Sequence, residues 1–219
     1  MLSDPAPATE VLLALAALAE QGSPWPVAQD LSEPAADWRP LTDLADPLVR
    51  QDLGGRISAT VGGCEPRVAE STLVLGLAAR LWSVALGSVA LTGVLPDLAH
   101  FAFTDDRGSV RLGLVHPRGW RTTDPRDVYE VVVTRTLSPI IASMTLAPRL
   151  LWGNVASALA GAARVLDLPG DGLAGALLDL PPLQGELDLS GRRATCCLFY
   201  RVPGAGLCGD CVLDAVPAL

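Results

Sequence analysis

The sequence contains no lysine, and this absence restricts the partners that the protein can have. All 16 basic residues are arginines, 24 residues are acidic, and the formal net charge is -8. Nucleic-acid binding depends on a basic face that contacts phosphate groups, and no arginine-rich run supplies one. We therefore expect no nucleic-acid partner.

Groups for acid–base or nucleophilic chemistry are also scarce. The chain has only 2 histidines, His100 and His116, and no paired-carboxylate or nucleophile motif. The glycine pairs at 54–55 and 62–63 lack the spacing and the preceding strand of a dinucleotide-binding fingerprint. The sequence therefore offers no hydrolytic centre and no site for a nicotinamide or flavin nucleotide.

Long hydrophobic runs are missing as well. The start of the chain lacks the basic region of a secretory signal, and the apolar run 11–19 is too short to span a bilayer. The stretch 81–95 is uncharged, but it is bracketed by Arg80 and Asp97 and is interrupted by glycines. We expect a buried helix there, no integral membrane span, and a cytoplasmic location.

The residues that are present favour helices. Half of the chain is hydrophobic but only 5% is aromatic, so Leu, Ala and Val must fill the core. Apolar residues at helical spacing predict helices over residues 8–21, 41–54, 71–93, 128–144, 148–166 and 172–178. Thr9 is the expected N-cap of the first helix, and Gly54–Gly55 is expected to end the second. The helix over 71–93 is apolar on nearly every face, so we expect it at the centre.

The period changes from helical to alternating near residues 98–116. Two alternating runs there are separated by Asp105-Asp106-Arg107-Gly108, which predicts an antiparallel hairpin. The expected fold class is α+β: mostly α-helical, with this small hairpin or sheet inserted. Residues 1–219 should form a single domain, in which 1–60 is a variable helical and loop part and 70–190 is the helical body.

The remaining segment, 191–219, carries the chemistry. It holds four of the five cysteines, Cys196, Cys197, Cys208 and Cys211, in the pattern Cys-Cys-x10-Cys-x2-Cys. In a reducing compartment such a group serves as metal ligands or as a redox centre more often than as disulfides. Three kinds of site are open: an iron–sulfur cluster, a structural zinc site, and a dithiol in which Cys208 and Cys211 are the working pair.

The spacing favours the cluster over the other two. A C-x-x-C loop suits chelation of one metal ion, and Gly209 allows a tight turn. Zinc sites commonly take two such loops, whereas the vicinal pair Cys196–Cys197 makes a cramped chelate for one ion. Spreading four sulfurs over two irons is geometrically easier. A thioredoxin-like dithiol belongs near the start of a helix in a βαβ unit, a context that is missing here.

The neighbouring residues fit a negatively charged cluster. Three arginines are close in sequence and can offset its charge or contact a substrate: Arg192, Arg193 and Arg201. Glycines at 204, 206 and 209 allow backbone N–H groups to approach the sulfurs, which raises a reduction potential. The alternative for each arginine is a solvated surface position.

The cysteine segment, read as CCLFYRVPGAGLCGDC, resembles the signature of the FhuF-type ferric-siderophore reductase family. Two upstream segments are similar to that family too, LLWGNVASAL at 150–159 and STLVLGLAARL at 71–81. The resemblance covers about residues 70–212. It implies a C-terminal iron–sulfur loop with a [2Fe-2S] cluster bound by Cys196, Cys197, Cys208 and Cys211. No role is implied for Cys64.

The resemblance also implies the activity and the partners. The expected reaction is one-electron reduction of an Fe(III)–siderophore, so that weakly held Fe(II) is released. Because the sequence shows no nucleotide-binding fingerprint, we expect the electron donor to be another protein such as a ferredoxin. The net charge of -8 favours neutral or cationic hydroxamate complexes over anionic catecholates, unless arginines near the cluster reverse this preference. The alternatives are a [2Fe-2S] electron carrier or redox sensor without siderophore turnover, and a structural zinc module.

Overall fold

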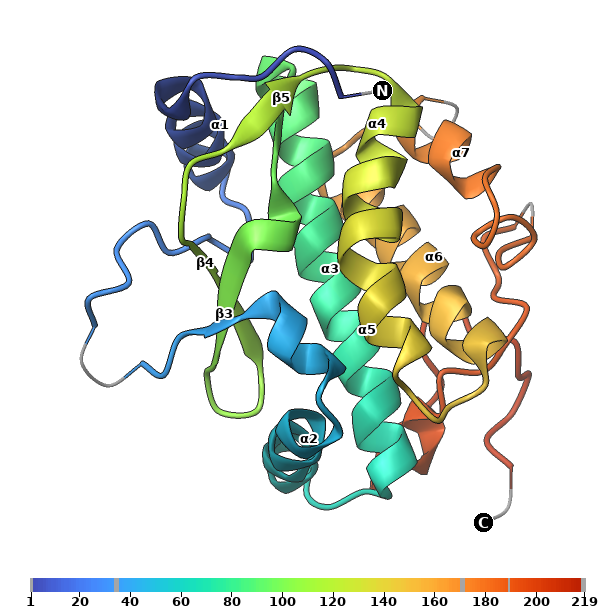
Figure 1. Ribbon diagram of the computed structural model, residues 1–219. Coiled ribbons are helices and arrows are strands. Elements are labelled where there is room, and N and C mark those ends of the chain that lie inside the picture. Colours follow the sequence, from blue (N-terminus) through green and yellow to red (C-terminus); the bar gives the residue numbers. More distant parts are fainter. Residues whose placement is uncertain (1, 34–35, 170–171, 189, 218–219) are drawn as a thin grey trace.

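The computed structural model describes residues 2–33, 36–169, 172–188 and 190–217. The protein is mostly helical with small antiparallel sheets, so the predicted α+β class is confirmed (Figure 1). The helices are α1 (Ala8–Glu20), α2 (Pro47–Thr60), α3 (Pro66–Thr92), α4 (Pro125–Tyr129), α5 (Ser138–Ala142), α6 (Pro148–Val165) and α7 (Leu173–Leu178). A π-helical stretch, Glu130–Leu137, joins α4 to α5.

Helix α3 occupies the centre, as its apolar composition predicts. It is 27 residues long, starts at Pro66, and ends where Gly93 adopts a left-handed conformation with φ of 69°. Helices α1, α2 and α6 pack around it (Figure 1). By length and composition, α3 is the one helix in the described part of the chain that could cross a membrane, and 72% of its apolar 18-residue window is buried inside the protein.

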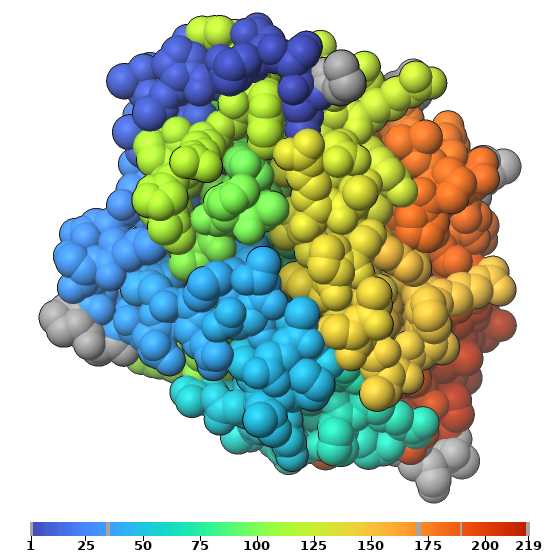
Figure 2. All heavy atoms as spheres, viewed as in Figure 1, coloured from blue at the N-terminus to red at the C-terminus, as the bar shows by residue number. Residues whose placement is uncertain are grey.

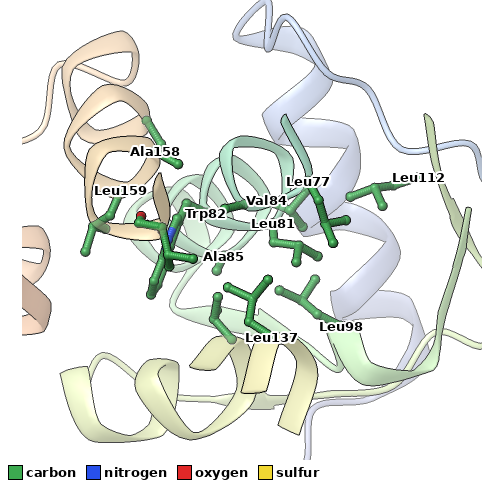
Figure 3. Close-up of a cluster of buried hydrophobic side chains, with 14 of the residues drawn as sticks. Leu77, Leu81, Trp82, Val84, Ala85, Leu98, Leu112, Leu137, Ala158 and Leu159 are labelled. Atoms are coloured by element: carbon green, nitrogen blue, oxygen red, sulfur yellow. The ribbon is translucent and has the colours of Figure 1, made fainter. Parts of the chain in front are cut away.

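The core forms where α3 meets α6 and the π-helical stretch. Trp82 is fully buried, and its indole Nε1 donates a hydrogen bond of 3.1 Å to the carbonyl oxygen of Val155 on α6. Leu81, Leu137 and Leu159 fill the space around it (Figure 3). This packing fixes the position of α6 along α3, which matters because both helices contact the cysteine segment. The division of the chain into a single domain of three parts stays a prediction.

The predicted hairpin is confirmed. Strands β3 (Phe101–Asp105) and β4 (Val110–Leu114) pair antiparallel, with Phe103 opposite Leu112. A short strand that the sequence did not predict, β1 (Arg39–Pro40), extends this sheet beside β3. A second small sheet pairs β2 (Val94–Pro96) with β5 (Gly119–Arg121).

Two predicted helix boundaries were wrong. Helix α1 begins directly after Pro7, so Thr9 lies inside the helix and does not cap it. Gly54 and Gly55 do not end a helix, because α2 continues to Thr60 and only Leu41–Ala45, a 3₁₀ turn, precedes it. A Cβ at Gly54 would lie 3.7 Å from the Cβ of Ala69, so this glycine stands at the contact between α2 and α3.

Candidate metal centre

The cysteine segment lies against the N-terminal half of α3 and against α6 (Figure 1). Its only regular element is a short 3₁₀ turn, η4 (Phe199–Arg201). Figure 2 shows part of this segment at the surface, next to the N-terminal end of α3. The backbone N–H of Arg193 donates to the carbonyl oxygen of Asp210 at 2.9 Å, which folds the two ends of the segment together.

This folding brings the thiol groups of the four cysteines together. The Sγ atoms of Cys197 and Cys208 are 3.6 Å apart, and the thiol of Cys196 interacts electrostatically with those of Cys197 and Cys211. Cys197 and Cys211 are buried, whereas Cys196 and Cys208 are partly exposed. The four predicted ligand positions therefore form one group at the edge of the protein.

Two backbone N–H groups point at the sulfurs. The N–H of Leu198 lies 3.3 Å from Sγ of Cys196, and the N–H of Leu213 lies 3.4 Å from Sγ of Cys211. Both donors are two residues after the cysteine that accepts. Leu198 has a φ of 68°, which is uncommon for a residue with a side chain, and stands directly before η4. The sequence analysis predicted that backbone N–H groups near glycines would approach the sulfurs, whereas the two donors observed here belong to leucines.

As free thiols, Cys196 and Cys208 resist ionisation. Burial raises the pKa of Cys196, opposed by the Leu198 N–H; the charges of Cys197 and Cys211 raise it further, while that of Arg193 lowers it. Burial also raises the pKa of Cys208, and the charge of Cys197 raises it further. A bound metal ion instead favours the ionised form of these cysteines, because a thiol loses its proton when its sulfur binds the cation. The donor set therefore fits a metal centre better than a set of free thiolates.

Among the described residues, no three His, Cys, Asp or Glu side chains are grouped so as to hold a single metal ion. The Sγ atoms of Cys197 and Cys208, 3.6 Å apart, have the separation of two thiolates on one tetrahedral metal ion, which suits zinc or one iron of a cluster.

Arg193 is the predicted arginine that faces the site. Its side chain is 2% exposed, donates to Oδ1 of Asn154, and leaves Nε and Nη1 without a hydrogen-bond partner among the described residues. Its charge acts on Cys196. A buried cation that is incompletely paired is costly unless negative charge lies nearby, so the position of Arg193 suits a negatively charged cluster.

The other two predicted arginines have different contacts. Arg192 donates to the carbonyl oxygens of Cys211 and Val212 at 3.1 Å and pairs with Asp214 at 2.8 Å. Arg201 pairs with Glu65 at 2.5 Å, just before α3 begins. These two arginines therefore hold the segment in place rather than turn their charge toward the thiols.

A buried polar network fixes the segment to the helices, and composition alone did not reveal it. The hydroxyl of Ser71 on α3 donates 2.6 Å to the carbonyl oxygen of Cys197. The Nδ2 of Asn154 on α6 donates 2.9 Å to Oγ of Ser71, while its Oδ1 accepts from Arg193. This network connects α6, α3 and the cysteine segment through buried hydrogen bonds.

The Trp152-Gly153-Asn154 element of α6 allows the cysteine segment to lie close to this helix. A Cβ at Gly153 would collide with the hydroxyl oxygen of Thr195, the residue before the vicinal cysteines. The Thr195 hydroxyl is also 3.4 Å from the carbonyl oxygen of Arg149, at the start of α6. Further along α6, Ser157 donates 2.5 Å to the carboxylate of Asp210, inside the C-x-x-C loop.

Fold and site together define a helical α+β protein that carries a surface group of four cysteines, held against two core helices, with a buried arginine beside it. The family model described as the FhuF 2Fe-2S C-terminal domain matches residues 193–213. The resemblance seen in the sequence is confirmed over this segment; the matched range does not include 71–81 or 150–159. The cysteine segment is thus similar to a FhuF-type 2Fe-2S domain, and this similarity suggests a redox function. A search of curated proteins gives no match to this chain.

Proposed function

We propose that the protein is a ferric-siderophore reductase whose [2Fe-2S] cluster is bound by Cys196, Cys197, Cys208 and Cys211. The observation that carries the proposal is the grouping of these thiols at the protein edge within the segment that matches the FhuF 2Fe-2S domain. When bound, such a cluster supplies one electron at a time. One electron converts Fe(III) to Fe(II), which oxygen-rich siderophores hold much less tightly.

The residues of the chain prepare the site for this role. The partly exposed thiols of Cys196 and Cys208 leave one side of the group accessible to donor and substrate. Cys197 and Cys211 are buried, and the Ser71 hydroxyl fixes the backbone of Cys197. Arg193 offsets the negative charge that a reduced centre gains.

A hollow near the start of α3 supports a docking place for the ferric complex. It has a volume of about 680 Å³, within the usual range for small-molecule sites, and lies between α2 and the start of α3. Its lining includes Arg50, Gln51, Cys64, Arg67 and Glu70.

One set of ion pairs connects this hollow to the cysteine segment. At its rim, Arg67 pairs with Glu65 at 2.8 Å, and Glu65 also pairs with Arg201, between Cys197 and Cys208. The lining carries both signs of charge, which suits a near-neutral hydroxamate complex better than a highly anionic catecholate one. We propose that the ferric complex docks here.

We also propose an electron donor and a cellular location for the protein. The electron comes from a donor protein such as a ferredoxin, and the protein works in the cytoplasm, where thiol ligands stay reduced. The part of the chain that the structure describes carries no basic recognition helix, and the net charge of -8 argues against a nucleic-acid partner.

The test is anaerobic purification followed by rapid mixing. The protein should be red-brown, with iron and acid-labile sulfide in equal amounts. The dithionite-reduced protein should be reoxidised by a ferric trihydroxamate, while an Fe(II)-specific chelator captures the product. A colourless protein with stoichiometric zinc would overturn the proposal. A cluster that no ferric siderophore reoxidises would instead assign the protein as an electron carrier or sensor.

A further inference from the structure

We propose that the two irons divide the cysteines as Cys197 with Cys208 and Cys196 with Cys211. Each half of the motif then contributes one ligand to each iron, and the C-x-x-C loop bridges the two irons instead of chelating one. The inference rests on the proposed function only in requiring a two-iron centre.

The first support is the separation between sulfurs. Metal–sulfur bonds of about 2.3 Å at a tetrahedral ion place two thiolate sulfurs about 3.8 Å apart. The Sγ atoms of Cys197 and Cys208 are 3.6 Å apart, close to this separation. Thiolates on different irons lie farther apart, because the bridging sulfides stand between the metals. The chain thus already presents this pair as ligands of one iron.

The second support comes from the vicinal pair. After Cys197 the backbone turns through the left-handed Leu198, and the Leu198 N–H bonds to Sγ of Cys196. The Leu213 N–H bonds to Sγ of Cys211 in the same way, two residues after the cysteine that accepts. Once Cys197 and Cys208 share one iron, Cys196 and Cys211, the two cysteines whose sulfurs take these backbone donors, remain for the other.

The third support is the way the C-x-x-C loop is held. The Cys211 N–H donates 3.2 Å to the carbonyl oxygen of Cys208, which closes a turn. Between them, Asp210 is fixed twice: its carboxylate accepts from Ser157 and its carbonyl from Arg193. Cys211 is thereby held on the buried side, while Cys208 stays at the surface.

The crossed pairing has a structural consequence. Cys197 and Cys211 are buried, and Cys196 and Cys208 are partly exposed. Each iron therefore takes one buried and one partly exposed thiolate. The two irons would therefore be about equally close to the surface, and either could pass the electron to a bound ferric complex.

The inference is tested by proton NMR of the reduced holoprotein. In a reduced two-iron cluster, cysteine β-protons on the ferric iron and on the ferrous iron differ in the temperature dependence of their shifts. Each single Cys→Ser variant removes the signals of one cysteine and so assigns them; a fourth cysteine is assigned by elimination. We expect Cys197 and Cys208 to share one temperature dependence, and Cys196 and Cys211 to share the other.

A second measurement covers the case in which the extra electron moves between both irons in the native protein. Serine oxygen is a harder ligand than cysteine sulfur and favours the ferric state at the iron that it binds. Mössbauer and electron paramagnetic resonance spectra of reduced Cys197→Ser and Cys208→Ser should therefore share one pattern, and those of Cys196→Ser and Cys211→Ser another. Pairing of Cys208 with Cys211, or of Cys196 with Cys197, would overturn the inference while leaving the reductase proposal intact. A protein without a two-iron cluster would overturn both.

Discussion

The hydroxyl of Ser71 lies 2.6 Å from the carbonyl oxygen of Cys197, a residue 126 positions later in the chain. Removing this hydroxyl leaves a buried carbonyl without its donor, which costs about 1–3 kcal/mol. We expect Ser71→Ala to lower the free energy of unfolding by that amount and to accelerate iron loss to a chelator. Denaturant titration and the decay of visible absorbance measure the two effects.

The neighbouring Thr72 provides the matched control. Its hydroxyl donates only to the carbonyl oxygen of Val68, within the same helix. Thr72→Ala should therefore leave iron loss unchanged. Equal acceleration in both variants would mean that the Ser71 bond does not hold the cysteine segment.

Arg193 should set the reduction potential. Its buried positive charge stabilises the more negative, reduced form, so its removal makes reduction harder. We expect Arg193→Gln to shift the potential in the negative direction by about 60 mV, which for one electron corresponds to about 1.4 kcal/mol. Redox titration followed by visible absorbance measures the shift on the fraction of protein that holds the cluster.

Two variants separate charge from packing at this position. Arg193→Lys keeps the charge and should retain most of the potential. Arg192→Gln removes a more exposed arginine that contacts carbonyl oxygens and Asp214, and should shift the potential much less. If Arg192→Gln and Arg193→Gln gave equal shifts, the proposed role of Arg193 would be wrong.

Gly153 and Gly161 lie on the same helix, and replacing each with alanine should change the stability of the protein in opposite directions. A Cβ at Gly153 would strike Thr195, whereas nothing lies within 4 Å of a Cβ at Gly161. Gly153→Ala should destabilise the protein by about 1–3 kcal/mol and weaken cluster retention. Gly161→Ala should stabilise it by up to about 1 kcal/mol through helix propensity. Thermal unfolding of both variants tests the pair, and a stabilising Gly153→Ala would contradict the close approach.

The alkylation rate of Cys64 tests whether the ferric complex binds in the proposed docking hollow. It lines the hollow and lies outside the four-cysteine group. A bound Ga(III)–trihydroxamate, which resembles the ferric complex but is not reduced, should slow alkylation of Cys64 in the holoprotein several-fold. Peptide mapping identifies the alkylated residue, and Cys64→Ala confirms it. An unchanged rate at a concentration of complex that saturates binding would place the siderophore elsewhere.

Much of the fold could be predicted from periodicity. The helix centred on Trp82 and the hairpin of Phe103 and Leu112 follow from apolar spacing, since burial decides both. Helix ends were less predictable. Gly54 and Gly55 are typical of a helix end, but packing against Ala69 outweighs their low propensity and α2 continues through them.

The four ligands stay a prediction from the sequence, and the groups that hold the cysteine segment against the helices could not be predicted from it. Cysteine spacing pointed to the four sulfurs, because metal chemistry restricts which residues can serve. Ser71 and Asn154 carry no such signature, since a buried hydroxyl or amide has meaning only through its partner. The resemblance of the Trp152-Gly153-Asn154 element to a known helix was the signal that could have identified Asn154.

The docking of the cysteine segment on α3 and α6 also orders events during synthesis. The ribosome makes both helices before it makes Cys196, and domains begin to fold while synthesis proceeds. The surface that receives the segment can thus exist before the first ligand is translated. The cluster would then be inserted into a protein whose helices have already folded. In a cell short of iron, the helical body would fold without the cluster, and the cysteine segment could still bind one later.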